Sequence, residues 1–240
     1  MATSPYWHDS RAPRYSILFA VPLLLTYEVL AWFLADPAGG GVRNGADVIL
    51  KSLFQALGGQ SGLLAFDVLL AGVGIWLMVR DWRRHPGGLR VGVFARMLAE
   101  SAVLAMLVGV VIGRATSAML RYLVIGPSGG LDLPTQLMIS LGAGIYEELL
   151  FRVIVVGALA SLGRRVLGWS PRTAGVVACG LGALLFSAFH YIGPFGDPLD
   201  AGSFIFRTLA GLTFSALYLL RGFGITAWTH ALYDVFVTLG

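Results

Sequence analysis

Residues 135–159 read TQLMISLGAGIYEELLFRVIVVGAL, an apolar run long enough to cross a lipid bilayer as a helix. A membrane-spanning helix needs about 20 predominantly apolar residues. Similar runs recur along the chain, at residues 16–35, 62–79, 97–113, 174–189, 204–220 and 223–239. The sequence therefore predicts an all-α fold, a polytopic transmembrane helical bundle of about seven to eight spans.

The composition indicates the same class of protein. Of the 240 residues, 57% are hydrophobic and 12% are charged, whereas roughly 25% are charged in an ordinary soluble domain. The mean hydropathy of +0.78 excludes a disordered chain and argues against a soluble enzyme. The sequence shows no internal repeat, linker or low-complexity segment, so residues 1–240 are expected to form a single integral membrane domain.

The distribution of basic residues predicts an orientation in the membrane. The net charge is +4, but the basic residues are spread over short loops, which does not suit a nucleic-acid surface. Loops rich in arginine and lysine stay on the cytoplasmic side. One side of an alternating topology carries Arg11, Arg14, Arg80, Arg83, Arg84, Arg90, Arg164, Arg165, Arg172 and Arg221. The other side carries mainly Arg43, Lys51, Arg114 and Arg121. The N-terminus is therefore expected in the cytoplasm.

Residues 44–57, between the first two runs, form a shorter amphipathic segment. Its apolar side chains recur at helical spacing, at Val48, Ile49, Leu53, Ala56 and Leu57. This pattern predicts a helix that lies along the membrane surface.

The run at 135–159 contains a cluster of ionisable residues, Glu147, Glu148 and Arg152. Ionisable groups inside a span are costly, so they are usually paired or functional. Glu148 and Arg152 are four residues apart and lie one above the other on a helix, which favours an ion pair. Glu147 is rotated about 100° from that face and has no evident local partner. Glu147 is therefore a candidate general base.

Histidines occur in two later runs. His190 follows Phe186 by four residues, and His230 and Asp234 share a helix face. Each group alone is more often a packing or solvated residue than a catalytic one. Together with the glutamates they lie on three separate helices and converge only if these helices pack together. From the residues alone, such a polar core fits hydrolysis or the transport of ions or protons.

The motifs E-E-x-x-x-R at 147–152, F-x-x-x-H at 186–190 and H-x-x-x-D at 230–234 together resemble the CPBP family of intramembrane proteases. This family includes the CAAX prenyl endopeptidases of the Rce type and the bacterial Abi proteins. The resemblance covers about residues 134–239 and places the catalytic helices there. It implies an intramembrane endopeptidase with a conical intramembrane cavity. It also implies a place in the bacterial inner (plasma) membrane.

The resemblance assigns a role to each matching residue. Glu147 would act as the general base and, with His190, activate a water for attack on the scissile carbonyl. Glu148 would hold the shape of the site through Arg152, with Phe186 in a supporting position. Activation of water and stabilisation of the developing oxyanion are the main tasks in amide hydrolysis.

The oxyanion would be stabilised by His230 and the last residue of its motif, Asp234. The family often has Asn at this last position, and Asp234 donates a hydrogen bond only when it is protonated. Burial could keep Asp234 neutral, or its carboxylate could orient His230 and stabilise the imidazolium. We favour the second alternative.

The resemblance implies a reaction without a metal or other cofactor. Two histidines with carboxylates could instead hold zinc with a water in the open position, although the sequence has no His-Glu-x-x-His pair. A zinc-dependent version of the same protease is therefore one alternative. A non-hydrolytic transporter or immunity protein is another. The expected partners are a membrane-anchored peptide or protein substrate and the lipid bilayer, with no nucleic acid.

Overall fold

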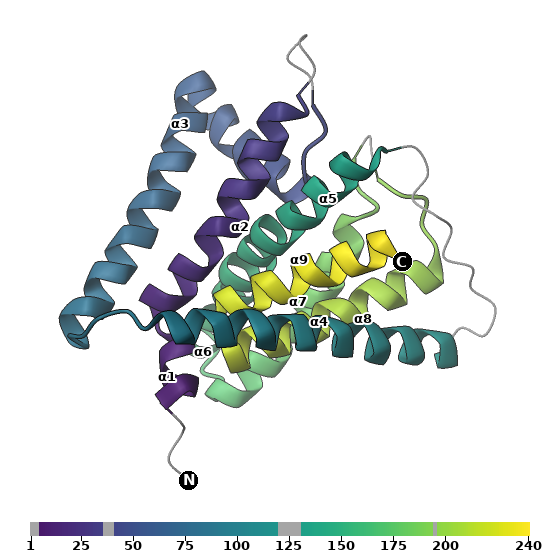
Figure 1. Ribbon diagram of the computed structural model, residues 1–240. Coiled ribbons are helices and arrows are strands. Elements are labelled where there is room, and N and C mark those ends of the chain that lie inside the picture. Colours follow the sequence, from purple (N-terminus) through teal and green to yellow (C-terminus); the bar gives the residue numbers. More distant parts are fainter. Residues whose placement is uncertain (1–4, 36–40, 120–130, 194–195) are drawn as a thin grey trace.

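The computed structural model describes residues 5–35, 41–119, 131–193 and 196–240, and every regular element within these ranges is a helix (Figure 1). In chain order the elements are α1 (Pro5–Arg11), α2 (Pro13–Phe33), α3 (Gly45–Arg84), α4 (Val91–Met119), α5 (Leu133–Gly142), η1 (Ala143–Val156), α6 (Gly157–Arg165), α7 (Pro171–Phe189), α8 (Ala201–Arg221) and α9 (Phe223–Leu239). The predicted all-α helical membrane bundle is confirmed.

Within the described ranges, five helices are long and apolar enough to cross a membrane. They are Pro13–Phe33, Gly45–Arg84, Val91–Arg114, Pro171–Phe189 and Ala201–Arg221. Two more predicted runs are also helical: residues 135–159 lie in the consecutive helices α5, η1 and α6, and residues 223–239 coincide with the 17-residue helix α9. Arg121, which entered the charge count, lies outside the described residues.

Helix α9 forms the centre of the bundle, where it packs against α2, α4, α5, α8 and η1 (Figure 1). Lipid tails provide no hydrophobic drive between helices, so close contact depends on small side chains. Such a contact occurs between η1 and α9. A Cβ atom added to Gly144 would lie 2.4 Å from the carbonyl oxygen of Ala227 and 2.7 Å from the Cβ of Ala231. This close approach places the residues of η1 directly beside those of α9.

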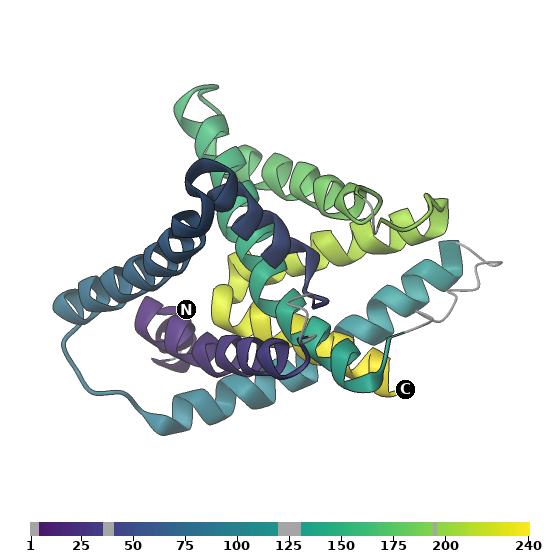
Figure 2. The same ribbon diagram turned by 90° about the horizontal axis from the view of Figure 1, so that it is seen from above.

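Helix α3 consists of two parts that meet at Gly59. This glycine has φ 58° and ψ −139°, a backbone conformation outside the helical region that glycine adopts without steric cost. The two parts approach each other closely near this turn, and glycine at position 62 leaves room for the approach. A Cβ atom on Gly62 would lie 1.9 Å from the carbonyl oxygen of Phe54. Seen from above, the second part lies away from α7 and α8, which run side by side (Figure 2).

The first part of α3 contains the segment that was predicted to lie along the membrane surface. The segment is helical from Gly45 onward, as expected. Its N-terminal residues, however, are buried: Asn44 is 2% exposed, and Ala46 and Asp47 are fully buried. The prediction missed this burial because apolar spacing does not show where polar side chains find partners.

We expect Gly144→Ala to destabilise the bundle. The added Cβ would meet backbone atoms of α9, which cannot move aside without shifting the helix, and overpacking of this kind costs about 1–3 kcal/mol. The melting temperature of the purified protein in detergent should fall. The matched control is Gly113→Ala, because a Cβ at Gly113 meets nothing within 4 Å. Equal melting temperatures for the two variants would contradict the close η1–α9 contact.

Candidate active site

The residues singled out from the sequence lie on three neighbouring elements. Helix η1 carries Glu147, Glu148 and Arg152, and it packs against both α7 and α9. His190 is the C-cap residue of α7, and α9 carries His230. The carboxylate of Glu147 is within electrostatic range of both imidazoles. The helices therefore bring the three motifs together.

The chain from α5 through α6 is helical without interruption, but the site segment is wound more loosely than an α-helix. Residues Ala143–Val156 form a π-helix. At its end, the backbone N–H of Gly157 donates to the carbonyl oxygen of Arg152, five residues earlier. Most π-type segments are single-turn bulges, and they are frequent at functional sites. This segment holds both glutamates and the arginine of the first motif.

Glu148 connects two helices from a fully buried position. Its Oε1 atom lies 2.7 Å from Nδ1 of His230 on α9. Its Oε2 atom lies 3.2 Å from Nε of Arg152, four residues further along η1, and both side chains are almost completely buried. The ion pair expected from the four-residue spacing is present. Both oxygens of Glu148 are therefore engaged in charge pairing.

Aromatic rings surround the guanidinium of Arg152. Its Cζ atom lies 4.5 Å from the ring centre of Phe186 and 5.7 Å from that of Phe214. Phe214 in turn stacks on the imidazole of His230 with ring centres 4.3 Å apart, and the ring of Phe186 lies 5.0 Å from that of His190. Phe186 thus supports the site through contacts with both a charged and a histidine side chain.

His230 has a carboxylate next to each of its ring nitrogens. Nδ1 faces Glu148, and Nε2 lies 3.5 Å from Oδ2 of Asp234. The side chain of Asp234 is 30% exposed, whereas that of His230 is 5% exposed. The ring of His230 is therefore held from both sides, and Asp234 is the partner that reaches the accessible side.

The ring of His190 is oriented by its own helix. Its Nδ1 atom lies 2.8 Å from the backbone carbonyl oxygen of Phe186. A carbonyl oxygen only accepts hydrogen bonds, so Nδ1 carries the hydrogen. In the neutral ring this leaves Nε2 as an acceptor. His190 therefore keeps Nε2 as an acceptor, and its imidazole lies within electrostatic range of the Glu147 carboxylate.

Sequence reasoning missed one residue of the site, Asn44. Its Nδ2 atom donates a 2.8 Å hydrogen bond to Oε1 of Glu147, which is 103 positions away in the sequence. Asn44 precedes a helix and belongs to a residue type that is favoured at N-caps, and this was its only sequence signal. Its contact with Glu147 depends on tertiary packing, which no local pattern shows.

The described residues contain no group of three or more His, Cys, Asp or Glu side chains placed to hold a metal ion. The predicted conical cavity remains a prediction. A pocket of about 520 Å³ lies at the N-terminal end of the bundle, where it is lined by Pro5, Tyr6, Arg90, Gly92, Val93 and Arg96. None of these residues belongs to the site.

Comparison with known proteins identifies a family for the second half of the chain. The family described as Type II CAAX prenyl endopeptidase Rce1-like matches residues 129–236. This segment contains all three motifs, and the match agrees with the resemblance drawn from them. The match supports a CAAX-type intramembrane protease, a family whose substrates are membrane-associated peptides. No curated protein and no solved structure matches the chain.

We expect Arg152→Ala to destabilise the protein strongly. The substitution leaves the charge of Glu148 without its η1 partner, and removal of one member of a buried pair costs about 3–5 kcal/mol. The control is Arg80→Ala, because this guanidinium is exposed and lies over the ring of Trp76, and exposed cation–π contacts contribute about 0.5–1 kcal/mol. Thermal melting in detergent compares the two. A fall in melting temperature in Arg152→Ala no larger than in the control would contradict the buried ion pair of Glu148 and Arg152.

Proposed function

We propose, from the match of residues 129–236 to the Rce1-like type II CAAX prenyl endopeptidases, that this chain is an intramembrane endopeptidase that activates water with a glutamate. Its substrate would be a membrane-associated peptide or protein, and its reaction the hydrolysis of one peptide bond. The family match supports the protease class, and the arrangement of the site residues supports the glutamate mechanism.

The observation that carries this proposal is the difference between the two adjacent glutamates. Glu148 is fully buried and both of its oxygens face cationic or histidine partners. Glu147 keeps 8% of its surface exposed, and its Oε1 accepts a hydrogen bond from the neutral amide of Asn44. Of the two carboxylates, Glu147 is therefore the less enclosed one, and we assign to it the capacity to accept a proton from water.

In the proposed reaction, the carboxylate of Glu147 takes a proton from a water molecule as the water oxygen attacks the scissile carbonyl carbon. The acceptor nitrogen Nε2 of His190 helps to orient that water. The tetrahedral intermediate then collapses, the carbon–nitrogen bond breaks, and the proton held by Glu147 passes to the leaving amine nitrogen. A positioned base of this kind contributes about 10²- to 10⁴-fold to the rate.

His230 and Asp234 would serve the oxyanion side of the site. Glu148 hydrogen-bonds Nδ1 of His230 at 2.7 Å, whereas Asp234 lies 3.5 Å from Nε2 as a charge contact. A carboxylate that fixes a catalytic histidine in this way is common in hydrolases. We therefore assign His230 the role of oxyanion stabiliser through Nε2, with Glu148 orienting its ring and Asp234 stabilising the imidazolium by its charge.

The proposal also includes the setting of the enzyme. We place the N-terminus in the cytoplasm, because the loop arginines gather on that side of the predicted topology. The family resemblance is the ground for proposing a bacterial inner membrane. The family description suggests a prenylated C-terminal peptide as the substrate class. The reaction as proposed uses no metal ion.

The test is cleavage of a farnesylated CAAX peptide by the purified protein in lipid vesicles. We expect cleavage by the wild type and a loss of at least about 10²-fold in both Glu147→Gln and His190→Ala. Glu147→Gln keeps the size of the side chain and an oxygen for the Asn44 hydrogen bond, but it removes the base. A zinc chelator should leave the rate of the wild type unchanged.

The matched control is Arg80→Ala, which removes an exposed guanidinium from the second part of α3 and should cleave like the wild type. Full activity of Glu147→Gln would contradict the glutamate mechanism. Loss of activity with the chelator and recovery with added zinc would establish the metal-dependent alternative instead. Identical behaviour of wild type and Glu147→Gln in cells, without cleavage of any peptide, would favour a transporter or immunity protein.

A further inference from the structure

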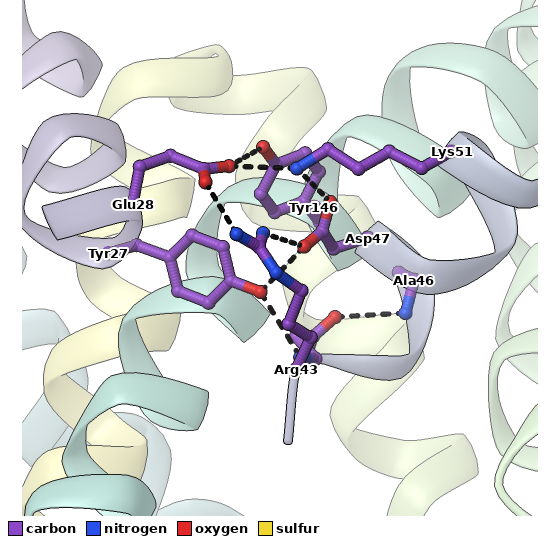
Figure 3. Close-up of polar contacts among 8 residues, drawn as sticks. Tyr27, Glu28, Arg43, Ala46, Asp47, Lys51 and Tyr146 are labelled. Atoms are coloured by element: carbon purple, nitrogen blue, oxygen red, sulfur yellow. Dashed lines mark hydrogen bonds and ion pairs between the residues drawn. The ribbon is translucent and has the colours of Figure 1, made fainter. Parts of the chain in front are cut away.

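A polar network lies at the N-terminal end of α3, where α2, α3 and η1 meet (Figure 3). It ends at the catalytic candidate Glu147, although most of its members come from the first quarter of the chain. The members are Tyr27, Glu28, Arg43, Asn44, Asp47, Lys51 and Tyr146. Apart from Tyr146, these residues lie outside the segment that matches the protease family.

Two cations and two carboxylates form the charged part of this network. Arg43 contacts Asp47 at 2.7 Å and Glu28 at 3.0 Å. Lys51 contacts the same two carboxylates, at 2.8 Å for Asp47 and 3.0 Å for Glu28 (Figure 3). The hydroxyl of Tyr146 donates to Glu28 at 2.6 Å. The charges balance, and the network ties the start of α3 to the residue that precedes Glu147.

Asn44 is held by this network through its backbone. Its N–H donates to the hydroxyl oxygen of Tyr27 at 3.2 Å, and that hydroxyl donates to Asp47 at 2.8 Å. The end of α5, which leads into η1, can approach this point because residue 142 is glycine. A Cβ atom on Gly142 would lie 2.8 Å from the Cβ of Asn44.

The side-chain amide of Asn44 has a fixed orientation. Its Oδ1 atom accepts the backbone N–H of Ala46 at 2.9 Å, which caps the N-terminus of α3. A backbone N–H only donates, so the atom toward Ala46 is the oxygen and the atom toward Glu147 is the nitrogen. The amide therefore presents an N–H donor to Oε1 of Glu147 at 2.8 Å.

We propose that Asn44 is a positioning residue for Glu147, fixing one carboxylate oxygen by an amide hydrogen bond so that Oε2 remains to take the proton from water. The residue acts through Glu147 and does not itself meet the substrate. The hydrogen bond between Asn44 and Glu147 exists whatever reaction the protein catalyses, whereas its effect on the rate rests on the proposed function. The N-terminal helices thereby contribute directly to a site whose other residues come from the second half of the chain.

The kinetic test uses Asn44→Ser and Asn44→Asp. Both replacements keep a side-chain oxygen that is favoured at N-caps, and both remove the amide donor. We expect the kcat for peptide cleavage to fall by about 10- to 100-fold through misplacement of the base, with KM little changed. A donor favours the charged form of a carboxylate, so its loss makes protonation occur at higher pH. The acid limb of the profile of kcat/KM should therefore move to higher pH.

The matched control is Ser170→Ala, which removes the N-cap of α7, where the Ser170 hydroxyl accepts the N–H of Thr173. This cap lies at the end of α7 opposite to His190. The control should lower the melting temperature and leave the pH profile in place. An equal displacement of the acid limb in Ser170→Ala would show a general effect of lost stability and would overturn the positioning role.

A second measurement does not need activity. Infrared spectra of the protein in lipid vesicles, recorded across a pH titration, contain a carboxylate band of Glu147 that is identified by its loss in Glu147→Gln. We expect the midpoint of this band to lie at higher pH in Asn44→Ser than in the wild type. Equal midpoints in the wild type and both folded Asn44 variants would overturn the proposal. If the wild type cleaves no peptide, the proposed function fails, while the infrared result still decides the role of Asn44.

Discussion

The charge of Glu148 has to be balanced inside the bundle, and the arrangement of the site follows from this requirement. An unpartnered buried charge costs several kcal/mol, so a fully buried carboxylate specifies its neighbours. Arg152 is supplied by the same helix, but His230 belongs to α9 and reaches Glu148 only when the two helices lie in contact. The small residues between η1 and α9 allow that contact. The pairing and the close packing therefore support each other, and together they place His230 and Asp234 beside the glutamates.

The need to balance the buried charge of Glu148 also gives the adjacent residues Glu147 and Glu148 different roles. Glu148 is occupied by its charged partners, whereas Glu147 lies on a different face of η1 and is 8% exposed, against 0% for Glu148. Among the described residues, the hydrogen bond to the Glu147 carboxylate comes from Asn44, a neutral donor. The segment that matches the protease family contains the motifs, but the environment of Glu147 also includes Asn44, the N-cap residue of α3. The N-terminal helices are thus part of the site as well as part of the membrane bundle.

Much of the fold could be predicted from the sequence, because long apolar runs indicate helices that are surrounded by lipid. The ion pair of Glu148 and Arg152 was also predictable, since a four-residue spacing brings two side chains together within a single helix. The meeting of His190 with Glu147 was expected only through the family resemblance. Three features left no usable local pattern: the turn at Gly59, the π-helical winding of η1 and the long-range contact of Asn44. Each of these features depends on how helices pack. For the same reason the apolar spacing of residues 44–57 predicts a helix along the membrane surface, although the first residues of this segment are buried in the protein.

The central claim is that adjacent glutamates differ in access, with Glu147 available to water and Glu148 sealed by its partners. Carbodiimide labelling of the folded protein in lipid vesicles, with the modified carboxylates located by fragmentation in a mass spectrometer, measures this difference without any substitution. We expect Glu147 to be modified while Glu148 stays unmodified until the protein is unfolded. Labelling of Glu148 at the same rate as Glu147 in the folded protein would contradict the account.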